Sequence, residues 1–150
     1  MEPLRVALAA VVAGEQATED LPDVAADALV RGLDTPALRA LAGTTRRDVR
    51  EARDLFLQAI DELGWPTPSE DEALNTLAHH WSAEMVEGRL RPYDAASLIW
   101  WTSANRLGKP EHLLEFVALA SEWQDHPDLR PELEVAMLSA ALKLLQRGRA

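Results

Sequence analysis

Hydrophobic positions recur every three to four residues along most of the chain, and this spacing predicts amphipathic α-helices throughout. Prolines, glycines and capping residues divide the pattern into about eight segments. The expected helices cover residues 3–13, 22–31, 36–42, 45–63, 69–87, 92–107, 110–124 and 128–146. The linkers are short and no repeat is visible. We therefore expect an all-α fold, with residues 1–150 forming a single compact domain of about seven to eight helices.

The helix boundaries rest on local chemistry. Thr35 precedes Pro36, and Ser69 precedes Glu72 by three residues, so both are expected to cap the helix that follows them. Thr45 and Asp48 resemble a second capping box. Composition agrees, because 25 Ala and 24 Leu stand against only 9 Val and 2 Ile, a balance that favours helices over sheets.

The two terminal helices are unusually apolar. Residues 3–13 contain a single charged side chain, Arg5. The last helix has apolar residues on both of its sides, namely Leu133, Ala136, Met137, Ala140 and Leu144 on one, and Val135, Leu138, Leu142 and Leu145 on the other. Such a helix is either central in the core or a contact surface for a second chain. We expect a central C-terminal helix, and the alternative is a homodimer formed through the apolar terminal helices.

Charge narrows the range of partners. The 25 acidic and 15 basic side chains give a formal net charge of −10, which disfavours nucleic acid and anionic membrane surfaces and suits a basic protein partner. The chain has no cysteine, and no apolar run approaches the roughly 20 residues that span a bilayer. A cytoplasmic location is expected.

Adjacent tryptophans in the helix at 92–107 point to a binding surface. Residues next to each other on a helix lie about 100° apart, so one core face does not bury both. Trp100 is expected inside, whereas Trp101 falls on the flank with Leu98, Asp94 and Asn105. An exposed tryptophan beside a leucine and rimmed by polar groups is typical of a protein-binding hot spot. Packing of this helix on two sides is the alternative.

Two further groups of residues are candidates for binding a small ligand. Arg46, Arg50 and Arg53 lie along one ridge of the helix at 45–63 and are candidates for binding an anion, or else form a solvated face. Three residues of the helix at 110–124 share one stripe of imidazole and carboxylate groups, the chemistry of a metal or acid–base site, although this face is expected to be wet. They are His112, Glu115 and Glu122.

Four segments of the chain resemble small all-helical actinobacterial proteins, and these are DTPALRALAG (34–43), EARDLFLQAIDELGWPTP (51–68), GRLRPYDAASLIWW (88–101) and FVALASEWQDHPDLRPELE (116–134). That resemblance implies an all-helical fold and an actinobacterial source, and it brings no defining catalytic motif. An acidic helical domain of this kind is also similar to the immunity proteins of bacterial toxin systems, whose toxins are often basic nucleases.

These observations predict a non-catalytic acidic protein-interaction module that binds a basic protein, either of the immunity or antitoxin type or a regulator. No cofactor is expected. The alternative is a small-ligand or metal-dependent helical enzyme that uses the Arg46, Arg50 and Arg53 ridge or the His112, Glu115 and Glu122 stripe.

Overall fold

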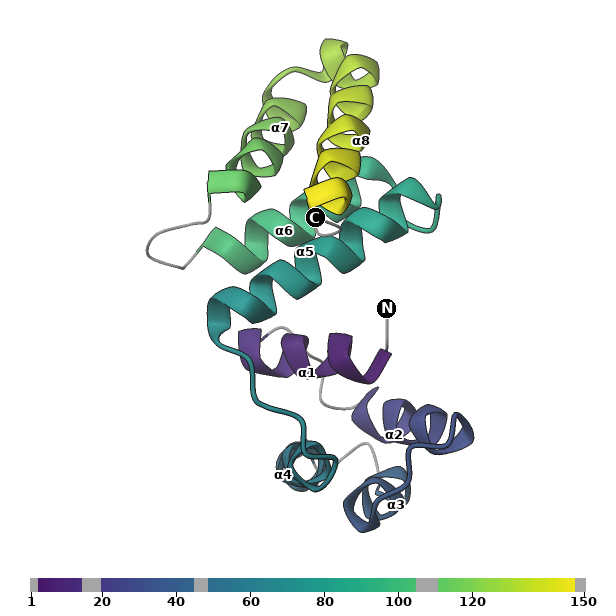
Figure 1. The fold of residues 1–150 in the computed structure, drawn as a ribbon. Helices are drawn as coiled ribbons and strands as arrows, with labels where there is room; N and C mark the ends of the chain where they lie inside the picture. Colours follow the sequence, from purple (N-terminus) through teal and green to yellow (C-terminus); the bar gives the residue numbers. More distant parts are fainter. Residues whose placement is uncertain (1–2, 15–19, 45–48, 105–110, 148–150) are drawn as a thin grey trace. The chain divides into compact units, whose positions relative to one another are not determined.

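Eight α-helices account for most of the residues that the computed structural model describes, which are 3–14, 20–44, 49–104 and 111–147 (Figure 1). No strand occurs in these ranges, and the predicted all-α fold of seven to eight helices is confirmed. The chain divides into two compact units, Met1–Ala73 and Leu74–Ala150, each with its own hydrophobic core. That residues 1–150 act as one domain stays a prediction.

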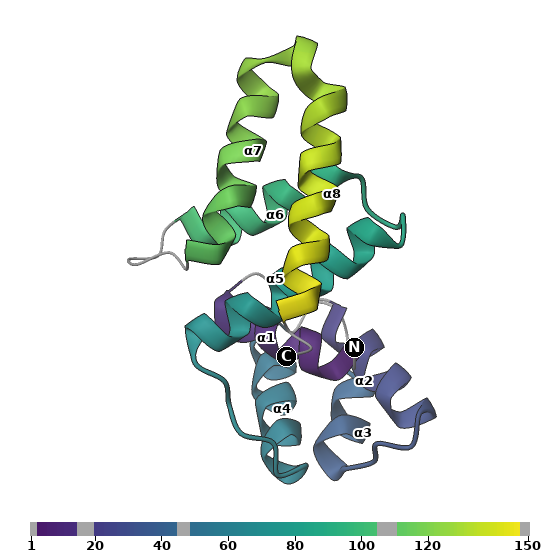
Figure 2. The same cartoon turned by 45° about the horizontal axis from the view of Figure 1, so that its top comes forward.

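Unit 1 contains the first four helices, which are α1 (Pro3–Ala13), α2 (Leu21–Val30), α3 (Pro36–Ala42) and α4 (Val49–Glu62). Helix α2 packs against α3, and α3 against α4, as Figure 2 also shows. The core side chains include Leu4, Leu8, Leu38, Leu41, Phe56 and Ile60. Arg5 of α1 lies over the Trp65 ring, with its guanidinium carbon 4.0 Å from the ring centroid.

The predicted caps form the expected hydrogen bonds. The Thr35 hydroxyl accepts from the Leu38 backbone N–H at 3.1 Å. The Ser69 hydroxyl accepts from the Glu72 backbone N–H and donates to the Glu72 carboxylate, both at 3.1 Å. Each cap satisfies a donor that the first turn of a helix otherwise leaves unpaired. The predicted box at Thr45 and Asp48 lies outside the described residues.

Unit 2 contains the other four helices, which are α5 (Glu70–Val86), α6 (Pro92–Ala104), α7 (Leu114–Asp125) and α8 (Arg130–Arg147). The boundary between the units lies in the first turn of α5. Short 3₁₀ turns precede α7 and α8, and α7 and α8 lie side by side (Figure 1). The core includes Leu74, Ala78, Met85, Ile99, Phe116 and Met137.

Helix α8 is buried along one side and not along the other. Leu133, Met137, Ala140 and Leu144 are buried as predicted. On the second apolar side, however, Val135 is 68% exposed and Leu142 is 48% exposed. Leu138 and Leu145 on this side are half-buried, so the expected burial of both sides is wrong for Val135 and Leu142. Helix α1, in contrast, contributes to the core of unit 1 as predicted.

Candidate functional site

The most exposed aromatic side chain in the described residues lies on α6. Trp101 is 70% exposed and Leu98 is 38% exposed. Three residues apart on a helix, they share one face, and we call this pair the Trp101 surface. Of the two interpretations that the sequence left open, the exposed one therefore holds, and a partner-binding role of this surface stays a prediction. Asn105, the fourth residue predicted here, lies outside the described residues.

The opposite face of α6 holds this helix in the core of unit 2. Ala95, Ala96 and Ile99 are completely buried there. The Trp101 ring stacks on Trp100, with the ring centroids 6.1 Å apart and the planes inclined at 23°. Stacking restricts the Trp101 side chain before any partner arrives, which reduces the entropy lost on binding.

Asp94, one turn before Leu98, already forms an ion pair. Its carboxylate accepts a hydrogen bond from the Arg91 guanidinium at 2.9 Å across the start of α6. The Asp94 side chain is 43% exposed, so solvent screens this ion pair and limits its contribution. Asp94 therefore stands as a polar neighbour of the Trp101 surface.

Trp123 differs from Trp101 because its ring has partners on other elements. It stacks on Tyr93 of α6 at 5.1 Å, and Arg130 lies 5.0 Å from its centroid. Gln124 donates to the Tyr93 hydroxyl at 2.9 Å. These contacts join α6, α7 and α8, so Trp123 serves the packing of unit 2.

The predicted arginine ridge is only partly described. Arg50 and Arg53 are exposed on α4, whereas Arg46 lies outside the described residues. The exposure of both guanidinium groups fits the solvated face that was the alternative interpretation.

The three residues of the stripe predicted at 110–124 differ in the structure, both in burial and in the element on which they lie. Glu115 and Glu122 are exposed, whereas His112 is half-buried in the 3₁₀ turn before α7. Across the described residues, no three His, Cys, Asp or Glu side chains gather where they would hold a metal ion. His112 instead contacts Asn75 of α5.

His112 and its neighbours line a small open pocket that the sequence did not predict. The His112 pocket, of about 220 Å³, is lined by Asn75, His79, His112, Leu144 and Arg147. His112 Nε2 lies 2.8 Å from the Asn75 side-chain oxygen, and donates to it. His79 Nδ1 donates to the Asn75 backbone carbonyl at 2.9 Å. One asparagine thus orients both rings.

A second pocket adjoins the first through His112, Leu144 and Arg147. It measures about 170 Å³, and Glu111, Glu115 and Lys143 contribute to its lining. Carboxylates are therefore present in this second pocket and absent from the lining of the His112 pocket.

Two histidines of unit 2 have lowered pKa values. Burial lowers the pKa of His112, and the positive charges of Arg147 and His79 lower it further. Burial also lowers the pKa of His80, where the nearby Glu84 carboxylate opposes the shift and Arg89 adds to it. Both rings are consequently neutral at physiological pH.

These shifts predict that acid destabilises the fold through His80 and His112. Because both folded-state pKa values lie below the unfolded value, the unfolded chain binds more protons, and stability falls as the pH drops below about 6.5. We expect the loss of unfolding free energy between about pH 7.5 and about pH 5 to be smaller in a His80→Gln, His112→Gln double variant than in the unaltered chain. Urea unfolding at both pH values measures this difference, and an equal loss in both proteins would contradict it.

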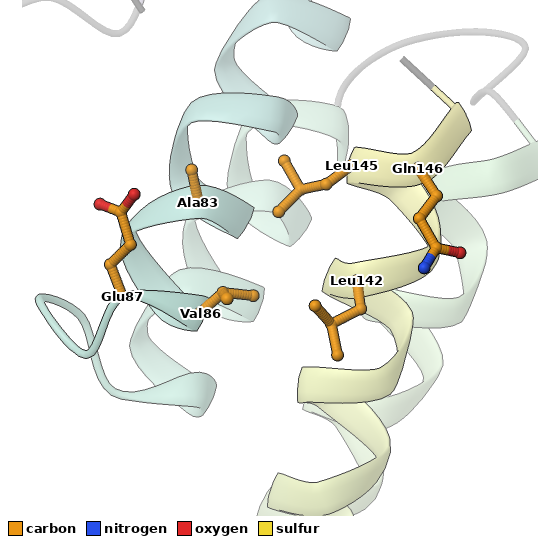
Figure 3. A pocket seen from close by; sticks show the side chains of 6 residues that line it. All are labelled: Ala83, Val86, Glu87, Leu142, Leu145 and Gln146. Carbon is orange, nitrogen blue, oxygen red and sulfur yellow. The ribbon is translucent and has the colours of Figure 1, made fainter. Parts of the chain in front are cut away.

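An apolar groove lies between α5 and α8 (Figure 3). It measures about 280 Å³ and is lined by Ala83, Val86 and Glu87 of α5 and by Leu142, Leu145 and Gln146 of α8. Val86 and Leu142, which are 39% and 48% exposed, make it the second apolar surface of unit 2. Glu87 and Gln146 are the polar side chains in a lining that is otherwise apolar.

Comparison of the chain with protein-family models, with curated proteins and with solved structures gave no match. Among the described helices, none combines the length and apolar character needed to cross a membrane.

Proposed function

We propose that this chain is a non-catalytic acidic protein-interaction module that binds a basic protein through the Trp101 surface. The observation that carries the proposal is the 70% exposure of a tryptophan on a helix whose other face is completely buried. Tryptophan is enriched at binding hot spots because one rigid ring supplies a large contact area. A partner that covers Trp101 and Leu98 removes this apolar area from water.

Charge supports a basic partner. Residues 1–73 contain 15 acidic and 7 basic side chains, a net charge of −8, whereas residues 74–150 contain 10 and 8, a net charge of −2. A negative field of this size accelerates encounters with a positively charged protein and slows encounters with nucleic acid. The acidic charge acts over a distance, and the Trp101 surface supplies the short-range contact.

The biological setting is part of the same proposal. A small acidic helical module that covers a basic protein resembles an immunity or antitoxin protein, acting in the cytoplasm of an actinobacterium on a toxin or on a regulated enzyme. Neutralisation requires only that the module bind tightly over the functional surface of its target.

Site-specific photocrosslinking tests the proposal. Trp101→p-benzoylphenylalanine, expressed in the source cells, is expected to crosslink one basic protein, because the probe replaces the central contact. Val135→p-benzoylphenylalanine is the matched control, since Val135 is 68% exposed on α8, apart from the Trp101 surface. Mass spectrometry identifies the products. Identical products from both positions, or only acidic proteins from position 101, would contradict the proposal.

A further inference from the structure

The His112 pocket concentrates nitrogen donors in a protein whose charge is strongly negative. Its lining combines the Arg147 guanidinium with the imidazoles of His79 and His112, and no carboxylate is among the five residues. Arg147 and His79 are close enough to His112 for their positive charges to act on its ring. An anion bound beside these groups favours protonation of imidazole rings that are otherwise neutral, and it pairs with the Arg147 guanidinium.

Hydrogen bonds to Asn75 determine which ring atoms remain available. A backbone carbonyl only accepts, so His79 Nδ1 must carry the proton that binds the Asn75 carbonyl. His79 Nε2 is then the free ring nitrogen, and it is buried without a hydrogen-bond partner among the described residues. A buried polar atom without a partner is uncommon, and protonation of this nitrogen changes it from an acceptor into a donor that an anion can accept from. His112 in turn keeps Nδ1 free, because Nε2 binds the Asn75 side chain.

We propose that the His112 pocket binds a small oxyanion, a carboxylate or a phosphate, between the Arg147 guanidinium and the two imidazole rings. Arg147 offers paired N–H donors that match two oxygens of such a group. The rings add donors when they are protonated at the nitrogens that Asn75 leaves free. This site is separate in residues and in chemistry from the Trp101 surface.

The size of the pocket limits the ligand. At about 220 Å³ it is smaller than the roughly 300–1,000 Å³ of pockets that hold drug-sized molecules. It therefore suits a single phosphate or a short carboxylate. Glu111 and Glu115 line the adjoining pocket together with Lys143, so a bound anion is expected on the α5 side of His112, away from both carboxylates.

Binding must be linked to proton uptake. The charged and titratable groups around His112 are His79 from α5, Glu111 and Glu115 from the α7 side, and Lys143 and Arg147 from α8. An anion beside His112 favours the protonated ring, so it raises the His112 pKa and binds more tightly as the pH falls. Among the described residues that line the two pockets, Glu111 and Glu115 are the carboxylates that oppose anion binding.

Proton NMR of the histidine rings in the full chain provides the test. Inorganic phosphate and succinate are titrated separately at constant ionic strength near pH 6, and at least one is expected to shift the His112 ring signal saturably and to raise its pKa. The anion that does so identifies the ligand class. Arg147→Gln is expected to weaken this binding about tenfold, as for loss of a hydrogen bond to a charged group. Arg147 is exposed at the end of α8, so the variant retains the core.

Lys143→Gln is the matched control, because Lys143 lines only the adjoining pocket, and its affinity is expected to stay within about twofold of the unaltered chain. The absence of a saturable shift with both anions would overturn the proposal. Equal affinity in the Arg147→Gln variant and in the unaltered chain would overturn it as well.

Discussion

Replacing Phe116 with alanine is expected to lower the free energy of unfolding by about 3–5 kcal/mol. Phe116 is 1% exposed in the core of unit 2, between the buried faces of α6 and α8. Removing its ring loses the apolar area that folding takes out of water and leaves a cavity that neighbouring side chains fill only in part. Because small domains are stable by about 5–15 kcal/mol, this change removes a large fraction of the total.

Urea unfolding followed by circular dichroism measures the effect. Phe56→Ala gives the corresponding change in the core of unit 1, where Phe56 is completely buried. Val135→Ala is the exposed control and is expected to change the unfolding free energy by less than about 0.5 kcal/mol. A loss below about 1 kcal/mol for Phe116→Ala would show that the core of unit 2 is not the one described.

Replacing Trp101 with alanine is expected to leave folding almost unchanged and to weaken binding of the basic partner by about 2 kcal/mol or more, about 30-fold in Kd. The two effects separate because 70% of the Trp101 side chain is exposed in the free protein and becomes covered only in the complex. The stacking of Trp101 on Trp100 adds to the expected loss, because the ring is already restricted before binding.

Much of the fold was predictable because it depends on local chemistry. The Thr35 and Ser69 caps need only residues within one turn, and the apolar sides of a helix need only the helical repeat. The second side of α8 was predicted wrongly for the same reason. Periodicity shows that Val135 and Leu142 share a side, whereas their exposure depends on which helices are available to cover them.

The candidate sites differ in the same way, because one depends on the geometry of a single helix and the other on contacts between helices. The exposure of Trp101 was one of two interpretations left open, and its position on the helix flank followed from its angle to Trp100. The His112 pocket did not, because Asn75 and His112 are 37 residues apart and come together only when α5 and the α7 region pack in one unit. The sequence placed His112 on a stripe with Glu115 and Glu122, but His112 lies in the 3₁₀ turn before α7, and helical periodicity does not reveal a partner on another helix.

The most direct test of the central claim is the affinity of the basic protein that crosslinks to position 101, measured by isothermal titration calorimetry with the unaltered chain, Trp101→Ala and Val135→Ala. We predict that Trp101→Ala weakens binding about 30-fold or more while Val135→Ala binds like the unaltered chain. Equal affinity for all three proteins would contradict the assignment of the Trp101 surface as the binding site.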